Sequence, residues 1–129
     1  MRIKVEIAPG ELLDKLSILE IKAERISDPD KLRHIRAERE TLAASRSGAI
    51  AASPEIDALF AELRAVNSAL WDIEDDIRVL ERNGDFGTEF VRLARSVYRT
   101  NDRRAEIKRD INRILGSDIA EEKSYEEFE

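Results

Sequence analysis

The chain has 129 residues and a formal net charge of −6; 39% of its residues are charged and only 5% are aromatic. This length suits one domain with an aliphatic core, and the acidic balance argues against a general nucleic-acid binder. The chain has no cysteine, which excludes disulfides, and no apolar run approaches the ~20 residues that span a bilayer, so we expect a cytoplasmic protein.

The first segment, residues 1–8, alternates apolar and polar side chains. Ile3, Val5 and Ile7 are separated by charged residues, and this period of two predicts a short, half-buried N-terminal strand. The backbone groups of a single strand need a partner. We expect that partner to be a second copy of the chain or the C-terminal tail, unless the segment lies extended across the helices.

Two helices then form a predicted short hairpin over residues 11–45. The first helix (11–26) has an apolar stripe wide enough to be buried on more than one side. Asp28 is suited to cap the second helix (30–44), which is only weakly amphipathic. Small and polar residues over 43–53 predict a flexible connection to the next helix.

The longest predicted element is an antiparallel pair of helices over residues 53–116. Ser53 and Pro54 suit the start of its first helix, and Asn83 and Gly84 suit its end. Apolar residues of the first helix recur in steps of three and four, as in the seam of a coiled coil. The seam consists of Ile56, Leu59, Leu63, Val66, Leu70, Ile73, Ile77 and Leu80.

Polar residues interrupt the seam of the second long helix. Asn101, Arg104 and Lys108 stand where aliphatic residues would complete the stripe, and a polar group in a seam costs stability unless it is satisfied. In one interpretation Asn101 sets the register while the two cations extend past the seam to water. In the other, these side chains form an anion-binding pocket inside the bundle. The candidate ligand-binding residues are Tyr98, Asn101, Arg104 and Lys108, with Arg95 and Arg99 as further cations.

These elements predict an all-α fold in a single domain, residues 1–129. The short hairpin packs on the long antiparallel hairpin as in a four-helix bundle, and residues 1–8 form an extended arm with strand character. Residues 117–129 form an acidic tail, in which Tyr125 and Phe128 can dock on the helices. The long helices span ~40 Å and the short ones ~24 Å. Part of the long seam is therefore expected to be covered by a second copy of the chain or by another protein.

Two pairs of carboxylates are each separated by one helical turn: Glu11 with Asp14, and Asp72 with Asp75. Helical nucleotide pyrophosphohydrolases bind Mg²⁺ with such pairs on facing helices, which makes Asp14 and Asp75 the metal-binding candidates. Acids at this spacing are also common on any charged helix. We therefore predict no required cofactor, with Mg²⁺ possible only for a metal-dependent enzyme.

Three stretches carry a resemblance to a known family. They are GELLDKLSILEIK at residues 10–22, SVYRTNDRRAEIK at residues 96–108 and EEKSY at residues 121–125. Together with LWDIE at residues 70–74, they are similar to a small family of uncharacterised bacterial proteins, described as a domain of unknown function. The resemblance implies no activity and no catalytic residues. It implies an accessory role beside glycosyltransferase or repeat modules, with a protein partner in cell-surface sugar metabolism.

Three functions are compatible with the sequence. The leading hypothesis is a dimeric interaction or accessory module. The alternative is a binder or metal-dependent enzyme that acts on a phosphorylated metabolite or nucleotide. A nucleic-acid adaptor is the third, because residues 92–113 are locally basic although the whole chain is acidic. No residue pattern establishes catalysis, so the sequence favours a protein that is not an enzyme.

Overall fold

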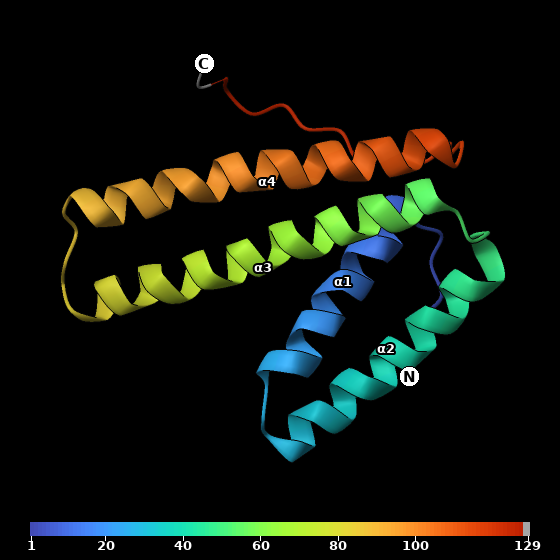
Figure 1. Cartoon of the computed structure of the whole chain (residues 1–129), viewed down its shortest axis with the longest axis horizontal. Coiled ribbons are helices and arrows are strands. Elements are labelled where there is room, and N and C mark those ends of the chain that lie inside the picture. Colours follow the sequence, from blue (N-terminus) through green and yellow to red (C-terminus); the bar gives the residue numbers. More distant parts are fainter. Residues whose placement is uncertain (128–129) are drawn as a thin grey trace.

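The computed structural model describes residues 1–127, which contain four α-helices (Figure 1). The helices are α1 (Pro9–Arg25), α2 (Pro29–Ala49), α3 (Pro54–Arg82) and α4 (Thr88–Ile114). The described residues include no strand, and the predicted all-α class is confirmed. A search of the same residues for a helix with the length and apolar character needed to cross a bilayer finds none.

Side chains near the helix ends satisfy backbone groups that the helices leave unpaired. Asp28 accepts a hydrogen bond from the Asp30 N–H at 2.9 Å at the start of α2, and Ser53 accepts one from the Ile56 N–H at 3.4 Å at the start of α3. α1, α2 and α3 each have proline in the first turn, where its missing N–H costs no hydrogen bond. After α3, Gly84 has a φ of 66°, which glycine adopts without the steric cost of a Cβ atom.

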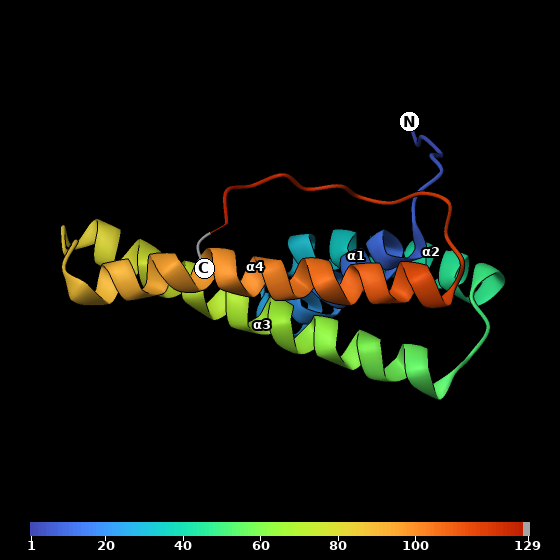
Figure 2. The same ribbon diagram turned by 90° about the horizontal axis from the view of Figure 1, so that it is seen from above.

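The two longest helices, α3 and α4, lie side by side and are joined by the turn at residues 83–87 (Figures 1 and 2). α1 packs against both of them and against α2, whereas α2 lies mainly against α1. In Figure 1, the α3–α4 pair extends to the left well beyond α1 and α2. Only one part of the long pair is therefore covered by the short helices.

The apolar core lies where α1 crosses α3 and α4. Its buried residues are Leu12, Leu13, Leu16, Ile56, Leu63, Ile107 and Ile111. The eight seam residues predicted for α3 are all buried or half-buried. Ile56 and Leu63 are fully buried because α1 covers them, whereas the seam from Leu70 to Leu80 is only half-buried.

Residues 1–8 differ from the prediction, since they form no strand. Ile3 and Val5 are 77% and 72% exposed instead of half-buried. Figure 2 shows this segment projecting away from the helices. The alternation showed which side chains can share a face, but a strand also needs a neighbour for its backbone, and residues 9–127 provide none.

The connection predicted at residues 43–53 is shorter than expected, because α2 continues to Ala49. Thr41 and Ser45 donate their hydroxyl protons to the carbonyl oxygens four residues earlier, so they stay compatible with the helix. The alanines of this region are also good helix formers.

The tail follows α4 as non-helical chain. The Ser117 N–H donates to the Asn112 carbonyl oxygen at 2.9 Å, which directs the tail back along α4. Tyr125 is 80% exposed, and the Lys123 ammonium lies 5.8 Å from the centre of its ring. Phe128, the other aromatic residue expected to dock, lies outside the described residues.

Candidate functional site

α1 approaches α4 closely because Gly10 has no side chain. A Cβ atom at Gly10 would lie 2.6 Å from the Lys108 carbonyl oxygen and 2.8 Å from Asn112 Oδ1. The Gly10 N–H instead donates a hydrogen bond of 2.7 Å to Asn112 Oδ1, in a buried position. This contact fixes the start of α1 against α4 and directs the acidic residues Glu11 and Asp14 towards the cations of α4.

Asp14 is a carboxylate buried among three helices, with only 1% of its surface exposed. Its Oδ1 atom accepts hydrogen bonds from Asn67 Nδ2 of α3 and from Arg104 Nε of α4, each at 2.9 Å. Its Oδ2 atom accepts a further hydrogen bond from Arg104 Nη2. Ser17 Oγ donates to the Asp14 carbonyl oxygen at 2.7 Å and accepts from Asn67 Nδ2 at 2.8 Å. One carboxylate thus joins α1, α3 and α4.

Lys108 links this carboxylate to a second acid of α1 and to the tail. Its Nζ atom lies 2.8 Å from Glu11 Oε2, 3.0 Å from Glu121 Oε2 and 3.9 Å from Asp14 Oδ2. We call Glu11, Asp14, Arg104, Lys108 and Glu121 the ionic cluster. It contains three carboxylates and two cations, and it is built by α1, α4 and the tail.

The surroundings of Asp14 and Lys108 in the ionic cluster stabilise the charged form of each. Burial raises the pKa of Asp14, but the hydrogen bonds from Arg104 and Asn67 and the nearby positive charges outweigh burial and hold that pKa below its ordinary value. Burial lowers the pKa of Lys108, and hydrogen bonds to Glu11 and Glu121 outweigh it, so that pKa is raised. Near neutral pH these groups keep their protonation states, which suits holding helices together better than transferring protons.

Two predicted ligand-binding residues, Arg104 and Lys108, belong to the ionic cluster. They bind carboxylates of the same chain, which α1 supplies to both cations and the tail supplies to Lys108. The prediction identified the cations but not the helix that supplies their partner. Asn101 is half-buried one turn away, and Arg95 is exposed nearer the α3–α4 turn.

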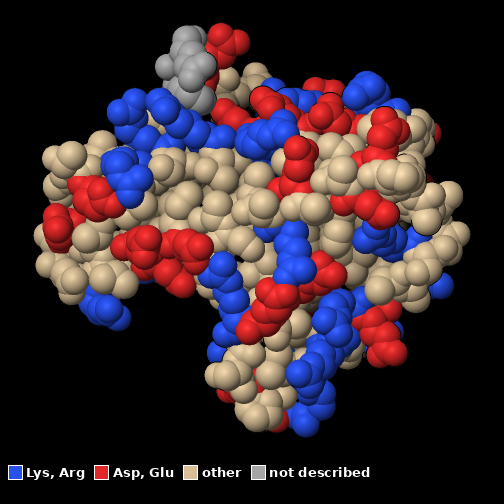
Figure 3. All heavy atoms as spheres, viewed as in Figure 1, with Lys and Arg blue, Asp and Glu red and all other residues tan. Residues whose placement is uncertain are grey.

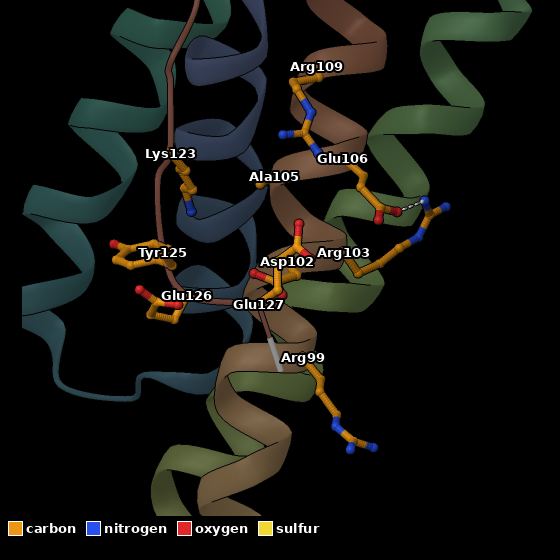
Figure 4. Close-up of a pocket in the computed structure, with 10 residues that line it drawn as sticks. All are labelled: Arg99, Asp102, Arg103, Ala105, Glu106, Arg109, Lys123, Tyr125, Glu126 and Glu127. Carbon is orange, nitrogen blue, oxygen red and sulfur yellow. Dashed lines mark hydrogen bonds and ion pairs between the residues drawn. The ribbon is translucent and has the colours of Figure 1, made fainter. Parts of the chain in front are cut away.

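The other predicted ligand-binding residues line cavities between α4 and the tail. Tyr98 and Asn101 line a cavity of about 530 Å³. Arg99 lines an adjoining cavity of about 660 Å³. In Figure 4, Lys123 and Tyr125 from the tail lie across a gap from the α4 side chains.

The two metal-binding candidates lie in different surroundings. Both carboxylate oxygens of Asp14 accept hydrogen bonds, from Asn67 and Arg104. Asp75, in contrast, is exposed on α3. Asp75 lines an open cavity of about 490 Å³ between α1, α3 and α4, and Arg104 lines the same cavity. Within residues 1–127, no three Asp, Glu or His side chains gather in a way that could hold a metal ion.

The sequence reasoning missed five residues that belong to the ionic cluster or support it. They are Gly10, Ser17, Asn67, Asn112 and Glu121. Asn67 lies four residues after the seam residue Leu63, so it falls on the inward face of α3. An amide at such a position is a signal for a buried polar partner.

The charges on the surface are mixed in sign. On the face drawn in Figure 3, lysine and arginine side chains gather along the left and middle of α4, and acidic side chains lie beside them. Nucleic-acid binding sites normally combine cations into a patch of one sign. In the locally basic stretch 92–113, Arg92, Arg103 and Lys108 each pair with a carboxylate, which reduces the positive charge available to a nucleic acid.

A comparison with protein families gives a match that covers nearly the whole chain. The model of a family described as "Family of unknown function (DUF6165)" matches residues 3–128. Neither the curated proteins nor the solved structures include a match.

Proposed function

This chain belongs to the family of unknown function DUF6165, and we propose that it acts as a dimeric interaction module. The surface that we assign to the second copy is the part of α3 and α4 that extends beyond α1. We call this surface, residues 70–98, the free end; at its inner border Trp71 and Asp72 still contact Arg25, the last residue of α1. In this proposal the protein has an accessory role: its free end binds a second copy, and the protein converts no substrate.

The relative lengths of the helices support this proposal. α1 has 17 residues, whereas α3 has 29 and α4 has 27. At about 1.5 Å per residue, α1 is ~26 Å long and the long helices exceed ~40 Å. The short helices therefore leave more than a third of the long pair uncovered.

The observation that carries the proposal is the incomplete burial of apolar side chains at the free end. Within residues 70–98, only Leu93 is fully buried. Val79, Phe86 and Val91 are 42%, 55% and 51% exposed, and the seam residues beside them are half-buried. These exposed side chains gather in α3, the turn and the start of α4, and a contact with another protein would remove them from water.

The ionic cluster supports binding over catalysis. Both oxygens of Asp14 already accept hydrogen bonds, and the charged forms of Asp14 and Lys108 are stabilised. The cluster holds α1 and the tail against α4. It thereby fixes which part of the long helices is covered and which part is left as the free end.

Sedimentation equilibrium tests the proposal with the double variant Val79→Glu/Val91→Glu. Both side chains are exposed, so the change should leave each chain folded. Each valine that is buried in a contact contributes about 1.5 kcal/mol, and a dimer of the variant loses two from each copy, so association should weaken by roughly four orders of magnitude. We expect the parent to sediment as a dimer at micromolar concentration and the variant as a monomer.

A matched control is Ala37→Glu on α2, which adds one charge at an exposed position far from the free end. Its association should equal that of the parent. A parent that stays monomeric at high micromolar concentration would contradict the proposal. Equal dimerisation of the parent and the double variant would move the interface elsewhere.

A second candidate function is the binding of a small phosphorylated metabolite or nucleotide between α4 and the tail. The supporting observation is the cavity of about 530 Å³, because Tyr98, Asn101 and Lys123 line it. Sites for small ligands usually enclose about 300–1,000 Å³. Arg109 and Lys123 line the neighbouring cavity and can supply positive charge.

The melting temperature, measured with a panel of nucleotides and sugar phosphates, tests this second candidate. A ligand at 100 times its Kd stabilises the folded state by about 2.7 kcal/mol, which gives a measurable rise. Lys123→Gln should abolish the rise, while Lys31→Gln on α2 should preserve it. The absence of a rise with every compound would remove this candidate and leave the interaction module unaffected.

A further inference from the structure

The N-terminal segment, residues 2–7, is an exposed stretch of chain without a backbone partner. No hydrogen bond joins its backbone N–H and C=O groups to the rest of the described chain. Ile3 and Val5 are largely exposed, and Ile7 is 38% exposed. The segment projects away from the helices, so a second chain can reach both of its edges (Figure 2).

Its sequence has two distinct faces when the backbone is extended. Ile3, Val5 and Ile7 point to one side and Lys4 and Glu6 to the other, because successive side chains of a strand alternate. Isoleucine and valine are among the residues most favoured in strands. An unpaired edge of this composition is a template for another strand.

The segment is complementary to itself in one antiparallel register. If Val5 lies opposite Val5 of a second copy, then Lys4 lies opposite Glu6 and Ile3 lies opposite Ile7, each twice. All apolar side chains then share one face, and every charged pair has opposite signs, which favours pairing. Centring the pairing on Lys4 or on Glu6 instead places two like charges directly opposite each other. The charge pattern therefore selects the register centred on Val5.

We infer that residues 3–7 pair with the same residues of a second copy as an antiparallel two-stranded ribbon, with the two-fold axis at Val5. This contact is separate from the free end. A two-stranded ribbon of five residues is only marginally stable by itself, so without a cross-link it does not hold two copies together at micromolar concentration. The N-terminal segment and the α3–α4 turn lie at opposite ends of the molecule (Figure 1). If both contacts form, each copy joins two neighbours.

Single cysteines test the register, because the chain has no cysteine of its own. Directly opposed Cα atoms in antiparallel strands lie about 4.5–5.5 Å apart, within the range that a disulfide spans. Val5→Cys should form a disulfide-linked dimer in a glutathione redox buffer. Ser27→Cys, in the exposed loop between α1 and α2, measures cross-linking by random collision. Pairing raises the effective thiol concentration to about the millimolar range, so Val5→Cys should exceed this control at least tenfold.

Charge reversals in the Val5→Cys background test the complementarity. Lys4→Glu alone and Glu6→Lys alone each place like charges opposite each other twice, and each should lower the disulfide yield about tenfold. A mixture of these two variants should recover the yield as a heterodimer, because every cross-strand pair then has opposite signs. The heterodimer is identified on a native gel by its intermediate charge. The double reversal Lys4→Glu/Glu6→Lys should also recover the yield.

Two results of these experiments would overturn the inference, and one further variant supplies a third. One is a Val5→Cys yield equal to that of Ser27→Cys, which would show that the segments do not meet. The other is an unchanged yield in both single reversals, which would show that the strands are not paired in this register. A higher yield for Lys4→Cys than for Val5→Cys would also reject this register. Repeating the Val5→Cys measurement with Val79→Glu/Val91→Glu separates this contact from the free end.

Discussion

Replacing Asp14 with asparagine tests how the ionic cluster holds the helices together. Asparagine keeps the shape of the side chain but removes the negative charge and turns an N–H donor towards the cations. Removing one partner of a buried ion pair commonly costs about 3–5 kcal/mol. Arg104 remains 29% exposed and water can hydrate it, so we expect the lower part of that range, about 3 kcal/mol.

Removing the other partner of the ion pair, Arg104, should lower the free energy of unfolding further. Arg104→Met leaves the Asp14 carboxylate buried, with 1% of its surface exposed, and with Lys108 at 3.9 Å as the nearest remaining cation. We expect about 4–5 kcal/mol for this change. The double variant Asp14→Leu/Arg104→Met removes both charges together. It should be less destabilised than the sum of Asp14→Leu and Arg104→Met, each measured alone, by at least ~1 kcal/mol, because apolar replacements of a buried pair are often close to neutral.

Urea unfolding, followed by circular dichroism and by the fluorescence of Trp71, measures these free energies. The control Asp76→Asn removes an exposed carboxylate from α3 and should change the free energy of unfolding by less than ~0.5 kcal/mol. A loss of less than ~1 kcal/mol for Asp14→Asn would refute the reasoning, and so would strict additivity in the double variant.

Three further predictions concern the packing and the charges around the cluster. Gly10→Ala places a Cβ atom 2.6 Å from the Lys108 carbonyl oxygen and should lower the free energy of unfolding by about 1–3 kcal/mol. In Gly48→Ala the added Cβ atom meets no atom within 4 Å, and the change should raise the free energy of unfolding by about 0.5–1 kcal/mol. Urea titration measures both changes. The folded-state pKa of Asp14 lies below its ordinary value of 3.8. The ionised carboxylate therefore stabilises the folded protein above about pH 4, and this contribution disappears as the pH falls through the folded-state pKa. In acid titrations the free energies of unfolding of the parent and Asp14→Asn should converge below about pH 4. Glu121→Gln removes the charge that binds the tail to Lys108 and should speed tryptic cleavage after Lys123, with a cost in unfolding free energy below about 1 kcal/mol because the glutamate is exposed.

The long helices could be predicted from the sequence because their signals are local. The steps of three and four from Ile56 to Leu80 identify one face of α3, and all of those positions avoid full exposure. The caps Asp28 and Ser53 act on amides two or three residues away, so tertiary packing is not needed to recognise them.

The ionic cluster could be predicted only in part, because its geometry depends on the path of α1. Arg104 and Lys108 interrupt an apolar stripe, and this is visible in the sequence. The burial of Asp14 is not visible, since acids one turn apart occur on many exposed helices. It follows from the close approach of α1 to α4 at Gly10, which is a tertiary contact. The alternation from Ile3 to Ile7 also could not show whether the chain contains a strand that pairs with it.

Hydrogen–deuterium exchange at low and at high protein concentration tests the dimeric interaction module most directly. The free end is a pair of helices with one fully buried residue, Leu93, so its amides should exchange readily in the monomer. We predict that peptides from residues 70–98 exchange more slowly at high concentration, while peptides from α2 exchange at the same rate under both conditions. Equal exchange of residues 70–98 at both concentrations, in a sample whose mass shows a dimer, would contradict the account.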